Sequence, residues 1–286
     1  MGGMTLARWH ADAVARLEAG GCPDPEADAR LLEEAALELP PERLRRLGES
    51  PLDAAQTARL EALLSHRLAG EPVQYVTGTA WFYGLPFHVD ARVLIPRFDT
   101  ENLVEAALGF LKTRGRAAEA LDVCTGSGAI GLSLAALLPG LRVTLTDLSE
   151  DALAVARLNA EALGVSARAE LLLGDLFAPV AGRTFDVICV NPPYIPTGEL
   201  AGLQREVQSE PVLALDGGAD GLDLYRRIAR EAGERLAPGG RVYLEVGIGQ
   251  ARTVLDWLSA ALHAAERGII HDLNGIERVV WAEKPI

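Results

Sequence analysis

Residues 185–195 read Phe185-Asp186-Val187-Ile188-Cys189-Val190-Asn191-Pro192-Pro193-Tyr194-Ile195, an apolar and largely β-branched run that stops at two prolines. The run predicts a buried strand over 184–190. Neither proline has an amide hydrogen, and the residue before a proline is disfavoured in a helix, so the strand must end in a rigid turn. The turn presents Asn191 and Tyr194 at the carboxyl end of the strand, where ligands bind in open α/β sheets.

This turn suits the alkylation of a planar nitrogen. An amide or exocyclic amino group is a poor nucleophile because its lone pair is delocalised. The Asn191 side-chain oxygen and the Pro192 carbonyl can accept its two N–H bonds, Pro193 holds the turn, and the ring of Tyr194 can pack on the planar group. Taken alone, the four residues are better explained as a plain strand stop.

A second stretch changes that balance. Residues 121–131 run as strand, glycine turn and helix, and Gly126, Gly128 and Gly131 match the pattern G-x-G-x-x-G. Asp147 follows Gly126 by 21 residues, at the end of the next predicted strand, where a carboxylate can bind ribose hydroxyls. By itself this pattern fits NAD as well as S-adenosylmethionine.

Asp122 and the turn at residues 191–194 favour S-adenosylmethionine, because hydride transfer has no evident use for Asn-Pro-Pro-Tyr. Asp122 lies just before the glycines, where it would repel a pyrophosphate but suits the ammonium group of a methionine moiety. Asp175, in the turn Gly174-Asp175-Leu176-Phe177, can accept from an adenine amino group while Leu176 or Phe177 covers the ring. An ordinary turn explains Gly174-Asp175 equally well.

The rest of the chain alternates strands and helices after residue 118, which predicts βαβ units and a parallel sheet. An Asn274-Gly275 turn then indicates a C-terminal antiparallel hairpin. An α/β, Rossmann-like, mostly parallel sheet with this finish is typical of a class I methyltransferase. We expect strands at 119–124, 142–146, 168–172, 184–190, 240–246, 268–272 and 277–283, and helices at 99–113, 128–138, 149–163, 221–236 and 249–262.

The N-terminal part has a different pattern. Leucines at helical spacing and Gly or Pro breaks predict a small helical bundle over residues 1–72. Residues 74–78 and 80–83 are β-rich, so we expect a linking β-hairpin at 73–90. The methyltransferase domain then covers 91–286.

Composition limits the partners and the compartment. The 286 residues carry a net charge of −13, which argues against nucleic acid as a direct partner. Three cysteines and five scattered histidines predict neither a disulfide framework nor a metal site. There is no apolar run long enough to span a membrane and no signal-peptide pattern. We expect a cytoplasmic monomer without a metal.

With these motifs assembled, the sequence resembles the bacterial peptide chain release factor glutamine N5-methyltransferase family. The resemblance runs from about residue 70 to the end. The N-terminal part resembles the family only in being helical, without matching motifs. It rests on residues 70–78, Leu94-Ile95-Pro96-Arg97 with Thr100-Glu101, 125–130, 191–195, Glu210-Pro211, Ala214-Leu215, Gly221-Leu222, and Glu245-Val246-Gly247 with Gln250.

The resemblance implies methyl transfer from S-adenosyl-L-methionine, leaving S-adenosyl-L-homocysteine, to the side-chain amide of a glutamine in the Gly-Gly-Gln loop of class I release factors. Because the helical domain is separate, we expect it to recognise this partner, and we expect Arg97 and Glu101 to build the pocket wall. The implied substrate and catalytic residues are Asn191, Pro192, Pro193 and Tyr194. The implied cofactor residues are Asp122, Cys124, Thr125, Gly126, Ser127, Gly128, Asp147, Asp175, Leu176 and Asn191.

Three positions depart from the family pattern. Phe98 replaces a rigid proline, Leu176 replaces a larger aromatic residue, and Cys124 replaces a glycine, which it fits only if φ is negative there. Other methyltransferases with the same turn, acting on a ribosomal-protein glutamine or on adenine N6, remain alternatives. So does a nucleotide-binding module or NAD oxidoreductase, for which residues 191–194 would have no role.

Overall fold

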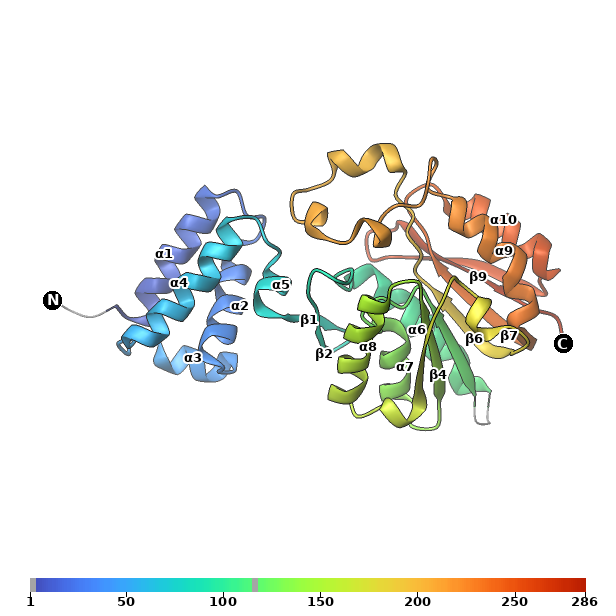
Figure 1. Ribbon diagram of the computed structural model, residues 1–286, viewed down its shortest axis with the longest axis horizontal. Helices are drawn as coiled ribbons and strands as arrows, with labels where there is room; N and C mark the ends of the chain where they lie inside the picture. Colours follow the sequence, from blue (N-terminus) through green and yellow to red (C-terminus); the bar gives the residue numbers. More distant parts are fainter. Residues whose placement is uncertain (1–3, 115–117) are drawn as a thin grey trace. The chain divides into compact units, whose positions relative to one another are not determined.

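The structure is a computed structural model that describes residues 4–114 and 118–286 (Figure 1). The chain forms two compact units. One contains the residues up to Thr79 together with 204–209, and the other contains 80–203 and 210–286.

The first unit is a helical bundle. Trp9, Leu17, Leu32, Leu60 and Leu64 are fully buried in its core because each helix repeats apolar residues every three or four positions. Its helices are α1 (Leu6–Ala19), α2 (Pro25–Leu37), α3 (Pro41–Leu47), α4 (Ala54–Leu68) and α5 (Val73–Thr77).

Helix α5 corrects the prediction for residues 73–78, which do not form a strand. Val73 and Tyr75 are buried, and Gly78 ends the helix with φ +71°. The β-rich composition of this short segment was misleading because packing against a helical unit overrides β propensity. The hairpin is therefore limited to β1 (Thr79–Phe82) and β2 (Leu85–His88).

Residues 204–209 belong to the helical unit although they come from the middle of the chain. Arg67 is 3% exposed and donates to Asp28 over 2.6 Å and to Glu206. A buried guanidinium needs such partners, so this ion-pair cluster fixes the segment to α2 and α4. Nothing in the sequence pattern indicated it.

The second unit is a seven-stranded sheet in the order β5-β4-β3-β6-β7-β9-β8. The first five strands in this order are parallel, and β9 pairs antiparallel with both β7 and β8. The strands are β3 (Glu119–Val123), β4 (Arg142–Asp147), β5 (Ala169–Leu173), β6 (Phe185–Val190), β7 (Leu236–Glu245), β8 (Glu266–His271) and β9 (Glu277–Glu283). The predicted fold class is confirmed.

Helices cover both faces of this sheet. Along β6, Val187 and Cys189 enter the core beneath α6 and α7, whereas Ile188 and Val190 enter the core beneath α9 and α10. Burial on both faces explains why β6 reads as a continuous apolar run. The helices are α6 (Glu101–Thr113), α7 (Ala129–Leu137), α8 (Glu150–Ala162), α9 (Asp223–Arg235) and α10 (Ala251–Leu262). Short 3₁₀ turns occur as η1 (Phe98–Thr100) and at 166–168, 178–180, 197–202 and 212–214.

The β1–β2 hairpin is joined to the sheet unit through Asn159 of α8, which is fully buried. Its side chain bonds both backbone groups of His88 and also donates to the Ser127 carbonyl oxygen, over 2.7 to 3.0 Å. One amide therefore connects the hairpin with the glycine loop. Within the described ranges, no helix is long and apolar enough to cross a membrane.

Candidate active site

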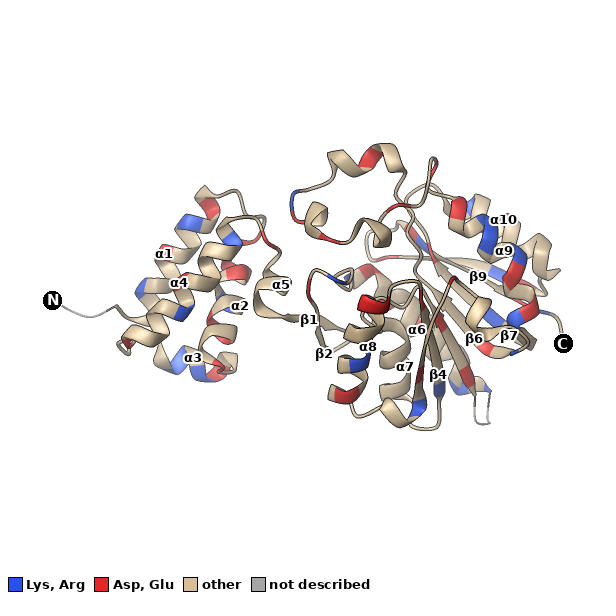
Figure 2. Cartoon of the chain, viewed as in Figure 1, with Lys and Arg blue, Asp and Glu red and all other residues tan. Residues whose placement is uncertain are grey.

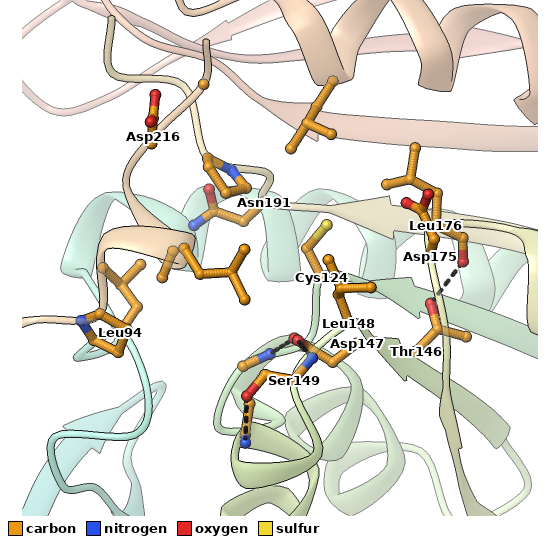
Figure 3. Close-up of a pocket in the computed structure, with 18 of the residues that line it drawn as sticks. Leu94, Cys124, Thr146, Asp147, Leu148, Ser149, Asp175, Leu176, Asn191 and Asp216 are labelled. Atoms are coloured by element: carbon orange, nitrogen blue, oxygen red, sulfur yellow. Dashed lines mark hydrogen bonds between the residues drawn. The ribbon is translucent and has the colours of Figure 1, made fainter. Parts of the chain in front are cut away.

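A cavity of about 410 Å³ lies at the carboxyl ends of β3, β4, β5 and β6 (Figure 3). This is the edge predicted for ligand binding, where parallel strands direct their final residues to one place. Its lining comes mainly from residues 92–94, Cys124 and Gly126, 146–149, 174–176, Asn191 and Pro193, and the segment 211–218.

The glycine loop between β3 and α7 is tightly wound. Gly128 has φ +83°, and a Cβ atom there would lie 2.5 Å from the side chain of Leu132, so any other residue would be strained. Cys124 has φ +58°. The condition under which Cys124 fits without strain is therefore not met, since a side chain in the left-handed region costs about 1–2 kcal/mol. Its sulfur faces the cavity (Figure 3).

Asp122 supports this loop from behind. Its Oδ2 accepts from Thr125 Oγ1 over 2.5 Å and from the Gly131 amide over 2.9 Å. The carboxyl is buried, and burial raises its pKa to about 7. Asp122 does not line the cavity. Its predicted contact with an ammonium group stays a prediction.

Two carboxylates at neighbouring strand ends face the cavity. Asp147 accepts from the amides of Gly126 and Ser149 over 2.8 and 2.9 Å (Figure 3), while burial raises its pKa. Asp175 forms an ion pair with Arg227 over 2.6 Å. The buried side chain of Leu176 and the half-exposed Leu148 provide apolar lining beside these acids.

The Asn-Pro-Pro-Tyr turn follows β6 directly. Asn191 and Pro193 line the cavity, Pro192 is buried, and Tyr194 lies half-buried behind the lining. Asn191 Nδ2 donates to Thr100 Oγ1 over 3.3 Å, and the Tyr194 hydroxyl donates to Glu245 Oε1 over 3.4 Å. Burial raises the pKa of Tyr194, so its hydroxyl stays protonated.

The backbone of the turn is held by the segment 215–221 and by Gln250. Gln250 Nε2 donates to the Tyr194 carbonyl oxygen over 3.0 Å, and its Oε1 accepts from the Gly247 amide over 2.9 Å. A Cβ atom at Gly221 would lie 2.3 Å from the same carbonyl oxygen. The conformation of the turn that ends β6 is therefore held by residues that come later in the sequence, including Gly221 and Gln250.

The comparisons with known proteins place this chain in a family. A family model described as PrmC N-terminal domain matches residues 8–78, and one described as methyltransferase small domain matches residues 97–205. The release factor glutamine methyltransferase of Moorella thermoacetica is 44% identical over 288 residues, covering 98% of each chain. The one from Cereibacter sphaeroides is 45% identical over 274 residues, covering 96% of each. This chain belongs to the release factor glutamine methyltransferase family.

A solved structure supports the fold of this family member. The crystal structure of a methyltransferase from Pyrococcus furiosus aligns with a TM-score of 0.51 at 22% identity, covering 71% of this chain and 91% of that one. At this identity the likeness establishes the methyltransferase fold and nothing finer.

The predicted site residues of this release factor glutamine methyltransferase divide into two sets. Those that line the common cavity are Cys124, Gly126, Asp147, Asp175, Leu176, Asn191 and Pro193. Those that lie outside the lining are Asp122, Thr125, Ser127, Gly128, Pro192 and Tyr194. The second set shapes the loop and the turn that carry the first. The binding roles of all of them stay predictions.

Arg97 and Glu101 do not line this cavity. Arg97 forms an ion pair with the buried Glu210, whose other oxygen accepts from the Ile95 amide over 3.1 Å. Glu101 accepts from the Tyr83 amide over 2.7 Å. The two residues instead support the segments beside the cavity, namely 92–94, 211–218 and the β1–β2 hairpin.

Sequence reasoning gave no role to three residues that the site uses. Thr100, Glu245 and Gln250 were noted only as parts of segments shared with the family. A buried acid at the end of an apolar strand was the available signal for Glu245. Thr100 and Gln250 carry no local signal, because their partners lie 91 and 56 residues away in the sequence.

Proposed function

We propose that this chain transfers a methyl group from S-adenosyl-L-methionine to the side-chain amide nitrogen of the glutamine in the Gly-Gly-Gln loop of class I release factors. One observation gives the main support for this reaction. Asn191 and Pro193 border the same cavity as the strand-end acids Asp147 and Asp175. The turn that is suited to binding a planar NH₂ group therefore lies beside a site that is suited to binding a nucleoside. Family membership supports the choice of substrate.

The cavity fits the methyl donor. A volume of about 410 Å³ lies in the range of small-molecule sites. Asp147 keeps free lone pairs for ribose hydroxyls after accepting from two amides. Asp175 can accept from the adenine amino group, and Leu148 with Leu176 can cover the ring. The loop of residues 124–128, with Asp122 behind it, would hold the methionine end.

The residues of the turn then orient the substrate. The bound sulfonium supplies an activated methyl group and a good leaving group. Within residues 4–114 and 118–286, neither Asn191 Oδ1 nor the Pro192 carbonyl oxygen receives a hydrogen bond. These two acceptors would hold both amide hydrogens of the glutamine and turn its nitrogen lone pair towards the methyl carbon. Alignment supplies most of the rate gain, and the surplus proton leaves to water after the new N–C bond has formed.

The partner of this reaction is a large protein, so a second recognition surface is useful. We assign that role to residues 1–72 of the helical unit. Direct binding of nucleic acid is disfavoured by the net charge of −13. Figure 2 shows Asp and Glu interspersed with Lys and Arg along α9 and α10. We further propose a monomer that acts in the cytoplasm, where its substrate works.

The test is methyl transfer from labelled S-adenosyl-L-methionine to three substrates: a class I release factor, its Gln→Ala version in the Gly-Gly-Gln loop, and duplex DNA. We expect label on the wild-type factor alone. Label on DNA would assign the turn to adenine N6 chemistry. Equal label on the Gln→Ala version would place the methyl group on another residue and contradict the proposal.

A further inference from the structure

Two buried side chains lie behind Asn191 and take no part in the reaction described above. Thr100 ends η1 and is 3% exposed, and Glu245 ends β7 and is 2% exposed. Asn191 Nδ2 donates to Thr100 Oγ1 over 3.3 Å. Asn191 and Thr100, which come from separate segments, therefore meet at the back of the turn.

The hydroxyl of Thr100 makes no hydrogen bond to the first turn of α6. The backbone of Thr100 is helical, with φ −66° and ψ −20°, because η1 runs directly into α6. The hydroxyl is therefore available to Asn191.

The hydroxyl of Thr100 lies close enough to Glu245 to lower the pKa of that carboxyl. Burial raises the pKa of Glu245 to about 7, Asp99 raises it further, and the hydroxyls of Thr100 and Tyr194, together with Arg278, lower it. Tyr225 donates to the Glu245 backbone carbonyl over 2.8 Å rather than to its carboxylate. Glu245 Oε2 is buried and has no geometric partner within the described ranges. One oxygen of the buried Glu245 carboxylate therefore lacks a hydrogen-bond donor, and a hydrogen bond from the Thr100 hydroxyl would stabilise the charged form.

We propose that Glu245 and Thr100 are positioning residues that set the orientation of the Asn191 amide. A threonine hydroxyl has one hydrogen. If that hydrogen goes to Glu245, Thr100 Oγ1 can only accept from Asn191, so the Asn191 NH₂ group points to Thr100 and Oδ1 points to the substrate. This inference rests on the proposed function, since it concerns the same amide substrate.

The opposite orientation of Asn191 would block the reaction. It would place the Asn191 NH₂ group against the NH₂ group of the substrate glutamine, donor against donor. It would also require Thr100 to donate to Asn191 Oδ1, which removes a donor from the buried Glu245 carboxylate. Protonated Glu245 can itself donate to Thr100 and so permits this unproductive orientation. Activity should therefore decline as Glu245 becomes protonated.

The first test compares Thr100→Val with Thr100→Ser in the full-length enzyme. We expect Thr100→Val to lower kcat for the release factor about 10- to 100-fold, with the KM for the methyl donor within about threefold of wild type. Thr100→Ser keeps the hydroxyl and should restore most of kcat. Thr144→Val is the matched control, because Thr144 is also a buried, hydrogen-bonded threonine, but its partners are Arg183 and Glu170 and not Asn191.

Equal kcat values for Thr100→Val and Thr144→Val would overturn the proposal, and so would a Thr100→Ser variant as slow as Thr100→Val. A wild-type enzyme that does not label the release factor would refute the proposed function itself. The two failures are therefore distinguishable.

A second measurement covers the case in which Thr100→Val does not fold. The pH profile of kcat should show an inflection near pH 7 in the wild type, where the pKa of Glu245 lies. Glu245→Gln should lose the part of this inflection that Glu245 contributes, because its amide cannot change charge. Asp122, whose pKa is also raised to about 7, and the release factor titrate in both reactions, so the difference between the two profiles reports Glu245, and identical profiles would overturn the proposal.

Discussion

At the residue scale, Cys124 shows what a sequence can and cannot reveal. The pattern around the glycine loop identified it as a departure from the usual glycine, but its backbone dihedral could not be read from the chain. The structure gives φ +58°, a conformation that glycine adopts freely and cysteine does not. The departure therefore carries local strain at the edge of the cavity.

Glycine at this position should relieve that strain. We expect Cys124→Gly to be more stable to unfolding than Cys124→Ala by about 1 kcal/mol, since alanine keeps a Cβ atom in the left-handed region. Urea unfolding of the two variants measures the difference. A more stable alanine variant would show that φ is negative there in solution.

At the element scale, the strands were predictable and several connections were not. Strand β6 is apolar on both faces, and its two prolines mark its end, so both its position and its exit were readable. Helix α3 has only seven residues and gave no clear period, and residues 73–77 were assigned to a strand. Short segments take their structure from their neighbours, which a local pattern does not contain.

The ends of strands β3 and β7 carry buried acids, and this has a consequence for stability. Burial raises the pKa of Asp122 and of Glu245 to about 7. Between about pH 4 and pH 7 the folded chain keeps protons that the unfolded chain has released. Stability should therefore fall as the pH rises through this window, and the loss should be complete above pH 7.

Asp122→Asn isolates one part of this dependence. An asparagine oxygen can still accept from the Gly131 amide, so the loop is retained, but the group no longer titrates. We expect the variant to lose less stability than wild type between pH 5 and pH 7.5, by an amount on the order of 1 kcal/mol or more. Urea midpoints at several pH values measure this. Parallel curves for the two proteins would exclude a protonated Asp122.

At the scale of the whole molecule, the sequence predicted two parts but not how the chain is shared between them. The glycine loop, the Asn-Pro-Pro-Tyr turn and the C-terminal hairpin were enough for the α/β unit. That Glu206 joins Arg67 and Asp28 in the helical unit could not be foreseen, because an ion pair 139 residues apart leaves no periodic trace. The same reason hid the link between Asn191 and Thr100.

The helical unit should matter for the whole partner and not for the chemistry. We expect deletion of residues 1–72 to raise the KM for an intact release factor by about tenfold or more, as loss of a recognition surface does. The KM for a short Gly-Gly-Gln peptide should change little. The peptide serves as the internal control, because damage to residues 204–209 or to the fold would impair both substrates. Equal effects on both would contradict a recognition role.

The role of Asn191 in orienting the amide is tested by single-turnover methyl transfer with Asn191→Ala, at saturating release factor and saturating methyl donor. Saturation removes any effect on binding, including that of the cavity wall which Asn191 forms. We predict a rate constant lower by about 100-fold or more, since alignment is the main source of catalysis here. A rate constant equal to that of wild type would show that the turn does not hold the substrate, and the proposed mechanism would be wrong.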